Sequence, residues 1–484
     1  MINLDKSLEV ISDITGYDVE QIEMSNKLID DLGFDSIMLM DLYHSIIGEE
    51  DNIEKRELLK DIVNSDITIE ELAKALGIEG IENTYPKQNT KIDNFQEVEW
   101  FAEYFDSLNE VPYFRKSDGI ASNHMIIEGE EKINYSTYNY LGLNGDPRVN
   151  EYAKKAIDKY GTSVSGSRLL SGEIELHEKL EQLISSFLGV EDSLVLVGGH
   201  ATNVNIIGCV VGEKDLILHD QMAHNSIIQG AILSHAKRKP FKHNDMERLE
   251  NELIKLRKKF RRVLIVVEGV YSMDGDICNL PDLLRIKEKY GAILMIDEAH
   301  SLGTIGKEGR GVTSYFGIDP NRVDIMMGTL SKSAASCGGY IAGSRKFIKH
   351  LRYNLEGFIF SCGCTPSNTA AAYKAIQLFM DESERVEKLN ENSKYFLNRL
   401  KECGFDTGLS CDTPVVPIMI GDSKKALHIS KRLYDKGVNA LPIIYPAVKE
   451  DEARLRFFMS SSHTKEDMDR TVEMLKVVYE EIEK

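Results

Sequence analysis

The sequence lacks the long apolar segments of a membrane protein. No run approaches the roughly 18 consecutive apolar residues that a membrane-spanning helix needs. The first ten residues, MINLDKSLEV, contain no basic segment followed by an apolar core, so they do not match a secretory signal peptide. These absences predict a cytoplasmic protein without a membrane span.

Cysteines are few and scattered along the chain. The seven of them are odd in number, which indicates reduced thiols rather than a disulfide framework; they stand at positions 209, 278, 337, 362, 364, 403 and 411. Cys362 and Cys364 are too close together for a zinc knuckle, and no second pair matches them. The sequence therefore predicts neither a disulfide scaffold nor a metal site.

Positive charge is also in short supply, and the deficit is uneven. The chain has 58 Lys+Arg against 78 Asp+Glu, a net charge of -20. Residues 1–80 contain 20 Asp+Glu and 6 Lys+Arg, so this short segment carries -14 and the rest only -6. A balance of this kind argues against nucleic acid as a partner and favours docking of an acidic module onto a basic protein surface.

The acidic residues 1–80 have the apolar spacing of a small helical bundle, for which we expect four helices. Apolar residues recur at helical intervals in three stretches: 3–15, 36–47 and 67–77. Residues 81–94 are polar, contain Pro86 and show no period, so we interpret them as a linker. An amphipathic helix over 95–108 is predicted to begin the main domain, 95–484.

From residue 145 onward, short apolar runs alternate with longer stretches of helical character. The predicted strands are 193–197, 215–219, 263–268, 292–297 and 323–327. This alternation predicts an α/β domain whose mostly parallel sheet has helices on both faces. We expect this large part to cover 145–385. Residues 386–484, with apolar runs at 414–420 and 454–460, predict a smaller α+β part.

Polar residues follow these strands at the edge where parallel α/β sheets bind ligands. The candidates are Gly198, Gly199, His200, His219, Asp220, His224, Glu268, Ser272, Asp297, His300, Thr329 and Lys332. GGHATN, residues 198–203, offers free backbone N–H groups before a helix, which suits a phosphate, although a plain strand-to-helix turn is the commoner meaning. Asp297 ends a buried strand, where the alternative is a helix N-cap, and His300 could be a satisfied turn residue.

Lys332 lies directly after a strand, in GTLSKSAASCGGY. A lysine in a tight, partly desolvated setting disfavours its charged form and can become an amine that forms a Schiff base; an exposed loop lysine is the alternative. A phosphate-binding turn, an acid for a pyridine nitrogen, a histidine and such a lysine together predict a pyridoxal phosphate site.

The chain resembles the α-oxoamine synthases, fold type I pyridoxal phosphate enzymes that include 8-amino-7-oxononanoate synthase and serine palmitoyltransferase. The resemblance runs from about residue 110 to the C-terminus. Its motifs are YNYLGL (138–143), GTSVSGSRLLSGEIELHEKLE (161–181), GHATN (199–203), DQMAHNSIIQG (220–230), EGVYSMDGD (268–276), DEAHSLGTIGKEGRG (297–311), GTLSK (328–332), FSCGCTP (360–366) and LRFFMSSSHT (455–464).

The resemblance implies a role for each matching residue. Lys332 would form the Schiff base and later move the α-proton, while His224 would stack on the cofactor ring as the second catalytic residue. Asp297 would pair with the pyridine nitrogen. The other implied cofactor contacts are Ser272 and His300 to the ring oxygen, Gly199, His200 and Thr329 to the phosphate, and Ser361 and Cys362 to the cofactor of the neighbouring subunit in a homodimer.

The implied reaction joins an amino acid to an acyl thioester. Asn139 and Arg456 would bind the amino acid, Arg456 gripping its carboxylate with two hydrogen bonds. Loss of CO2 from the β-keto acid would then leave an α-amino ketone. The sequence departs from the family pattern at His200, where an aromatic residue is usual, and at Ser163 and Ser165, where smaller residues are usual.

Because the implied reaction needs an acyl thioester, the acidic N-terminal segment can be interpreted as the carrier of the acyl group. Its LGFDSI sequence resembles an acyl or peptidyl carrier protein, in which the serine of the Asp-Ser pair bears 4'-phosphopantetheine; here that serine is Ser36. A helix N-cap is the alternative for Asp35-Ser36. The carrier interpretation implies a phosphopantetheinyl transferase and an acyl-loading enzyme as partners. The basic run 255–262 could dock the acidic module or form a solvated helix end.

Three other functions remain open from the sequence. The first is the same condensation with free acyl-CoA, the carrier segment being vestigial. The second is an aminotransferase that acts on carrier-bound carbonyl compounds. The third is an interaction module built on an inactive synthase fold, against which the presence of Lys332, Asp297, His224 and Arg456 argues.

Overall fold

The computed structural model describes residues 111–482 without interruption. Before residue 111 it describes only these positions: 4–15, 17, 19, 22–34, 38, 39, 42, 45, 67–75, 98, 102, 103, 106 and 108. In that described part of the chain, no helix is both long and apolar enough to cross a membrane. The predicted linker 81–94 and the serine at position 36 lie outside the described residues, as do most of the helices expected over 36–47 and 95–108.

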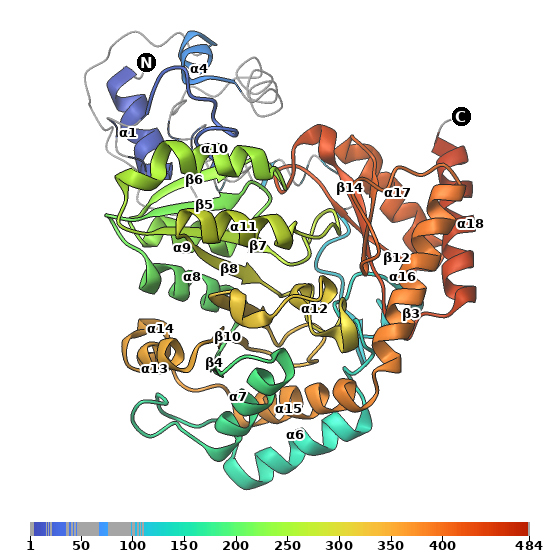
Figure 1. Ribbon diagram of the computed structural model, residues 1–484. Coiled ribbons are helices and arrows are strands. Elements are labelled where there is room, and N and C mark those ends of the chain that lie inside the picture. Colours follow the sequence, from blue (N-terminus) through green and yellow to red (C-terminus); the bar gives the residue numbers. More distant parts are fainter. Residues whose placement is uncertain are drawn as a thin grey trace.

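A seven-stranded sheet forms the centre of the main domain (Figure 1). Its strands, in spatial order, are β4 Asp192–Leu196, β10 Gly339–Gly343, β9 Ile325–Thr329, β8 Ile293–Asp297, β7 Val263–Glu268, β5 Leu216–Asp220 and β6 Lys237–Phe241. Only β10 runs antiparallel to its neighbours. The prediction of a mostly parallel sheet is therefore confirmed, with all five expected strands present within two residues of their expected bounds.

Sequence patterns missed two of these strands for different reasons. The sequence of β6, KRKPF, has three polar or charged residues and a proline, which the ladder tolerates because β6 stands at the sheet edge. The sequence of β10, GYIAG, is short and bounded by glycines. Both segments form strands because of their positions in the sheet. A local sequence pattern carries no information about those positions.

Both faces of the sheet are buried, and each face packs against its own set of helices. In β7, Val263, Ile265 and Val267 enter one hydrophobic cluster, while Leu264 and Val266 enter another. The first cluster includes residues of α10 Met246–Leu256 and α11 Leu280–Tyr290, and the second includes residues of α8 Gly199–Val210, α9 Asn225–Leu233 and α13 Arg345–Asn354. The alternation follows from the two-residue period of a strand, and it explains the continuous apolar runs.

Three helices close the sheet at its β4 end: α6 Pro147–Tyr160, α7 Glu175–Leu188 and α15 Pro366–Asp381. Local sequence sets where two of them begin. Asp146 accepts the N–H of Arg148 and Pro147 takes the first helical position of α6, while Thr365 and Pro366 repeat this arrangement at α15. Shorter helices complete the large part: η3 Arg257–Lys259, η4 Lys307–Gly309, α12 Val312–Tyr315, η5 Pro320–Arg322 and α14 Glu356–Ile359.

Two smaller sheets lie on the C-terminal side (Figure 1). One is β11 Val415–Met419, β14 Arg454–Phe458 and β13 Leu441–Ile443; the other is β1 Ser117–Asp118, β2 His124–Ile127, β3 Glu130–Asn134 and β12 Val438–Asn439. The helices beside them are α16 Glu384–Glu402, α17 Ser423–Asp435, η6 Glu450–Glu452 and α18 Lys465–Ile482. Because β3 pairs with β12, the chain before residue 145 packs with its C-terminal part.

Two of the expected N-terminal helices are described. They are α1 Leu4–Thr15 and α4 Ile69–Ala75, and they lie beyond the β6 edge of the sheet (Figure 1). Two arginines of the basic run 255–262 bind the main domain: Arg257 donates to Tyr290 O, and Arg261 pairs with Asp215.

A buried ion network ties the carboxyl end of β5 to the segment after β7. His243 shares hydrogen bonds with Asp220 (2.8 Å) and Asp276 (2.9 Å); the backbone N–H of Asn244 also donates to Asp220, and its side-chain amide donates to Asp276. Burial disfavours the imidazolium, but these two carboxylates outweigh burial and raise the pKa of His243 to about 10. The network therefore contains a cation at neutral pH.

We expect His243 to make thermal stability depend on pH. Because its pKa is raised on folding, its contribution is fully present below about pH 6.5 and is lost as the pH rises through about 10. His243→Gln should lower the free energy of unfolding at pH 7 by about 3 kcal/mol and flatten the fall in melting temperature between pH 7 and 10. The exposed His428→Gln is the control; equal pH profiles for wild type and His243→Gln would contradict this expectation.

Candidate active site

The candidate residues meet at one edge of the central sheet. Glu268 and Asp297 end β7 and β8 and stand opposite each other in the ladder. Thr329 ends β9, and Lys332 follows it three residues later. Because β7, β8 and β9 are parallel, their carboxyl ends coincide, and this juxtaposition follows from the register.

The first turn of α8 forms a small cradle next to Thr329. Gly199 is the first residue of α8, and a Cβ atom at this position would stand 2.8 Å from Thr329 Oγ1. The Thr329 hydroxyl also lies 2.8 Å from Ser331 Oγ. Free N–H groups at a helix N-terminus, glycine and hydroxyls together suit a phosphate group. His200 is exposed beside this turn, with its ring 6.3 Å from that of His224.

Asp297 is buried and held from two sides. Its Oδ1 accepts the N–H of Ala299 at 2.9 Å, and its Oδ2 accepts from Asn203 Nδ2 at 2.7 Å. The same Asn203 amide donates to Ser226 Oγ, which lies 2.7 Å from His224 Nδ1. Asn203 and Ser226 thus position the acid and the histidine, and sequence reasoning gave neither a role, although both lie within the GHATN and DQMAHNSIIQG motifs.

Lys332 carries its amine among these groups. Loss of hydration lowers the pKa of Lys332 to about 8, although Asp297 and Glu268 pull it upward. The Nζ atom lies 5.5 Å from the centre of the Tyr138 ring. A lysine with such a pKa has a sizeable neutral fraction near pH 7 to 8, which is the form that attacks a carbonyl carbon.

Glu268 is the least satisfied acid of the site. It is buried, and its Oε1 has no hydrogen-bond partner among the described residues. Burial, then the charge of Asp297, raises the pKa of Glu268 well above its usual range. The two carboxyl groups at neighbouring strand ends therefore differ in their hydrogen bonding: Asp297 has a donor to each oxygen, whereas Glu268 Oε1 has none among the described residues.

Ser272 and Arg456 come from different parts of the chain and meet here. Arg456 lies on β14 and donates to Ser272 O at 3.0 Å, with its guanidinium 4.6 Å from the centre of the Phe458 ring. Burial lowers the pKa of Arg456, and its Nε has no hydrogen-bond partner among the described residues. A guanidinium with a spare donor can bind a carboxylate.

His300 faces two aromatic residues. Its Nδ1 and the Tyr140 hydroxyl share a hydrogen bond of 2.7 Å, and its ring stacks on Phe458 with an interplanar angle of 12°. Burial, with the nearby Lys332 and Arg456 charges, lowers the pKa of His300 well below its usual range. His300 is therefore neutral. Tyr140 was part of the YNYLGL motif, but its partner could not be read from the sequence.

Three predicted residues have their recorded contacts with residues outside this cluster. Asn139 holds a turn: its Nδ2 donates to Ala121 O, and its Oδ1 accepts the N–H of Asn144. Ser361 and Cys362 follow α14, and Cys362 pairs with Ser167 in an isolated bridge and is exposed. Roles for these three residues stay predictions.

The segment GTSVSGSR, residues 161–168, in which the sequence departs from the family pattern, includes Ser167 of the Ser167–Cys362 bridge. Ser165 has a φ of 49°, in the left-handed region that usually favours glycine. Its N–H donates to Ser163 Oγ at 3.0 Å. This local hydrogen bond stabilises a turn that would otherwise suit a smaller residue.

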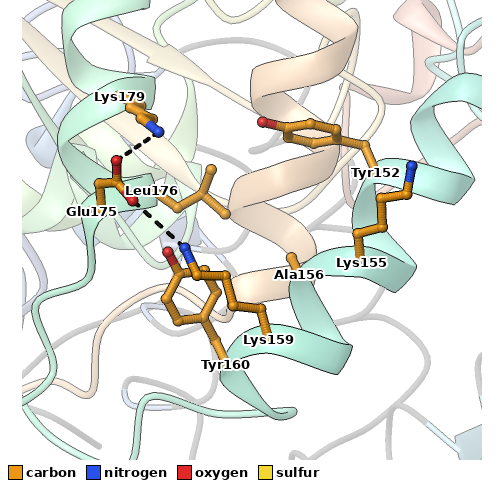
Figure 2. A pocket seen from close by; sticks show the side chains of 8 residues that line it. All are labelled: Tyr152, Lys155, Ala156, Lys159, Tyr160, Glu175, Leu176 and Lys179. Atoms are coloured by element: carbon orange, nitrogen blue, oxygen red, sulfur yellow. Dashed lines mark ion pairs between the residues drawn. The ribbon is translucent and has the colours of Figure 1, made fainter.

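A separate hollow of about 150 Å³ lies between α6 and α7 (Figure 2). Lys159 and Lys179 line it, and both pair with Glu175, at 3.6 and 2.7 Å. None of the predicted site residues lines this hollow. Because its charges are already paired, we assign it no ligand.

The residues at the sheet edge fit pyridoxal phosphate. A cradle without a Cβ atom stands beside a threonine hydroxyl, a doubly held carboxylate suits a protonated pyridine nitrogen, and a lysine has a lowered pKa. They would be contributed by Gly199, Thr329, Asp297 and Lys332.

We expect capture of pyridoxal phosphate by Lys332 to accelerate as pH rises through about 8. The capture rate rises with pH because only the neutral amine reacts, and the Lys332 amine loses its proton as the pH passes its lowered pKa. Borohydride trapping followed by peptide mass spectrometry should place the label on Lys332 and show the rise. Lys332→Ala should capture none at this peptide, while the exposed Lys179→Ala should behave as wild type. A label that accumulates equally at pH 6 and 9 would contradict the expectation.

Comparisons with known proteins agree with this geometry. A family model described as aminotransferase class I and II matches residues 130–475. The chain is 40% identical to the 8-amino-7-oxononanoate synthase of Thermosipho melanesiensis over 78% of this chain and 97% of that protein. It is 40% identical to the serine palmitoyltransferase of Bacteroides ovatus, over 75% and 92% of the two chains.

Solved structures show the same similarity. The serine palmitoyltransferase of Sphingomonas wittichii superposes with a TM-score of 0.77 at 28% identity, covering 81% of this chain and 99% of that one. A high-resolution serine palmitoyltransferase structure containing pyridoxal phosphate has a TM-score of 0.76 at 30% identity and covers 80% and 97%. The chain therefore belongs to the class I and II aminotransferase family and, within it, to the pyridoxal phosphate-dependent α-oxoamine synthases.

Proposed function

We propose that this protein condenses an amino acid with an acyl thioester, with loss of CO2, to form an α-amino ketone. The observation that carries the proposal is the meeting of Lys332, Asp297, His224 and Arg456 at one sheet edge in a chain of this family. Pyridoxal phosphate, when bound, supplies a sink for the electrons released at the amino-acid α-carbon. The remaining chemistry belongs to the protein's own side chains.

Each side chain has one task in this proposal. Asp297, fixed by Asn203 and Ala299, keeps a proton on the pyridine nitrogen. The Lys332 amine removes the α-proton and later returns one, for which a pKa near working pH is suited. His224, oriented by Ser226, would stack on the cofactor ring, and neutral His300 would share a hydrogen bond with the ring oxygen.

Arg456 would orient the amino acid. Its spare Nε and the planar geometry of the guanidinium suit a carboxylate bound by two hydrogen bonds. The burial that lowers its pKa also strengthens its attraction for an anion, because the surroundings screen charge less than water does. The same carboxylate is the group lost as CO2 after the acyl group has been joined.

We also propose that the acyl group arrives on the N-terminal segment, bound to phosphopantetheine at Ser36. The support is the LGFDSI sequence, the charge of -14 on residues 1–80, and the thioester that such a condensation needs. A phosphodiester at a helix N-terminus would sit at the favourable end of the helix dipole. A phosphopantetheinyl transferase and an acyl-loading enzyme would serve this segment.

A homodimer is the assembly that we propose. Leu170 and Phe360 each leave 84% of their surface exposed, and each lies in a segment that forms the Ser167–Cys362 bridge. Large apolar side chains so exposed on a folded enzyme mark a contact surface. A second copy covering them would bring its own residues next to Ser361 and Cys362.

Arg456→Lys should raise the KM for the amino acid and lower kcat/KM by about tenfold to a hundredfold, because a lysine cannot make the paired hydrogen bonds of a guanidinium. Steady-state kinetics at saturating acyl thioester measures both constants. The KM for the thioester should stay within about twofold. The exposed Arg470→Lys is the control, and an unchanged amino-acid KM in Arg456→Lys would remove its proposed role.

Intact mass spectrometry tests delivery from Ser36. The protein is converted to its phosphopantetheinyl form, loaded with candidate acyl groups, and given pyridoxal phosphate with each amino acid. We expect one amino acid to unload the arm and release CO2, and Ser36→Ala to accept no load, with Ser25→Ala as the matched control.

Other outcomes identify the alternative reactions. If every amino acid leaves the arm loaded while Ser36→Ala turns over acyl-CoA at the wild-type rate, the substrate is free acyl-CoA and the carrier proposal is wrong. Formation of pyridoxamine phosphate without CO2 would instead show an aminotransferase.

A further inference from the structure

The N-terminal segment is attached to the main domain by a buried arginine. Arg238, on β6, is only 2% exposed. Its guanidinium donates to three carbonyl oxygens of the segment: Gly33 at 3.2 Å, Leu32 at 3.3 Å and Thr15 at 3.4 Å. Nη1 also lies 3.3 Å from His219 Nε2. One side chain of the main domain therefore binds both the end of α1 and the turn at residue 33.

Close packing accompanies these hydrogen bonds. Gly33 has a φ of 69°, and a Cβ atom there would stand 2.9 Å from Pro240 Cγ. Ile228 and Tyr445 of the main domain join the hydrophobic cluster of the N-terminal segment. A further ion pair joins Arg248 to Asp31 at 3.7 Å. The contact thus combines apolar burial, backbone hydrogen bonds and charge.

A cavity of about 360 Å³ lies where the two parts meet. Ile29, Phe34 and Leu39 of the N-terminal segment line one side of it. His224 and Ser272, two of the residues at the sheet edge, line the other. The cavity therefore connects the N-terminal segment with the candidate active site.

The lining of the cavity combines apolar and polar side chains. Apolar side chains such as Met222, Met273 and Val448 provide most of it, and the amides of Gln221 and Asn225 lie among them. Small-molecule sites commonly combine an apolar lining with a few polar groups, and this volume is within their usual range. A chain with amide groups and an alkyl end, which describes an acylated pantetheine, fits such a lining.

We propose that this cavity is the entry channel for a pantetheine-linked acyl thioester, and that Arg238 holds Phe34 and Leu39 in place as its outer wall. The inference rests on the proposed condensation. In the sequence, Phe34 and Leu39 stand two and three residues from Ser36. The family match begins at residue 130, so the outer wall comes from outside the matched region. The N-terminal segment shapes the path of the substrate as well as supplying it.

Binding of an unreactive probe tests the channel. The probe is the thioether S-hexyl-pantetheine, titrated into the pyridoxal phosphate-loaded full-length protein by calorimetry. Phe34→Ala should weaken binding by about tenfold, whereas Phe34→Leu, which keeps most of the side-chain volume, should weaken it by less than about threefold. Phe316→Ala, on an exposed aromatic residue outside the cavity lining, is the control.

A second measurement tests whether Arg238 anchors the N-terminal segment. Arg238→Met removes the donors to Thr15, Leu32 and Gly33, and hydrogen exchange at residues 22–34 should accelerate by about tenfold while β7 and β8 stay protected. Protection of these strands shows that the main domain has folded. Probe binding should weaken with the loss of the wall, and amino-acid-induced changes in cofactor absorbance should persist.

The source of the arm is resolved by two further samples. In one, S-hexyl-coenzyme A is free; in the other, the same thioether is attached to the protein's own carrier by a phosphopantetheinyl transferase. Slower exchange at the backbone around Met222 and Val448 in either sample supports the channel, and the sample in which it occurs names the source. No protection in either sample overturns it.

The proposed channel and the proposed condensation can be contradicted independently of each other. Phe34-dependent probe binding without CO2 release from any acyl thioester would leave the channel standing and reject the condensation. CO2 release with probe binding that is identical in wild type, Phe34→Ala and Arg238→Met would leave the condensation standing and reject the channel.

Discussion

The register of three parallel strands is the constraint on which the site depends. Because β7, β8 and β9 run in the same direction, Glu268, Asp297 and Thr329 reach the same edge of the sheet. The two-residue period of each strand buries the intervening side chains in separate cores on the two faces. Both cores are needed to hold the edge, since a shift of one residue would turn every side chain to the opposite face.

Desolvation gives the groups at this edge their chemical character. Burial disfavours charge on Lys332, Glu268 and His300 alike, and their neighbours decide how each responds. Asp297 has two hydrogen-bond donors, whereas Glu268 has an oxygen without a described partner. Groups of different hydrogen-bonding environment are thus held within one small volume.

The N-terminal segment meets the same edge from outside. Arg238 is buried and binds backbone carbonyl oxygens rather than a carboxylate, so the contact depends on the shape of the segment more than on its negative charge. In the basic run 255–262, for which the sequence left docking of this segment and a solvated helix end both open, Arg257 and Arg261 bind their own domain. The cavity beside Phe34 follows from where Arg238 places this segment.

Much of the site could be predicted because its key residues follow apolar runs or lie in motifs of adjacent residues. Asp297 and Lys332 are of this kind. Asn203, Ser226 and Tyr140 lie in motifs of their own, yet their partners are 94, 2 and 160 residues away, and only the fold brings the two distant pairs together. The roles of Asn139, Ser361 and Cys362 came from family likeness alone.

The sequence by itself determined the alternation of strands and helices, the helix starts at Pro147 and Pro366, and the identity of the chemical groups, because these depend on neighbours a few residues away. The tertiary structure alone decided that KRKPF and GYIAG become strands, that Glu268 Oε1 lacks a hydrogen-bond partner among the described residues, and that Arg238 binds the N-terminal segment. These features depend on contacts between distant parts of the chain, whose cost in chain entropy only the folded core offsets.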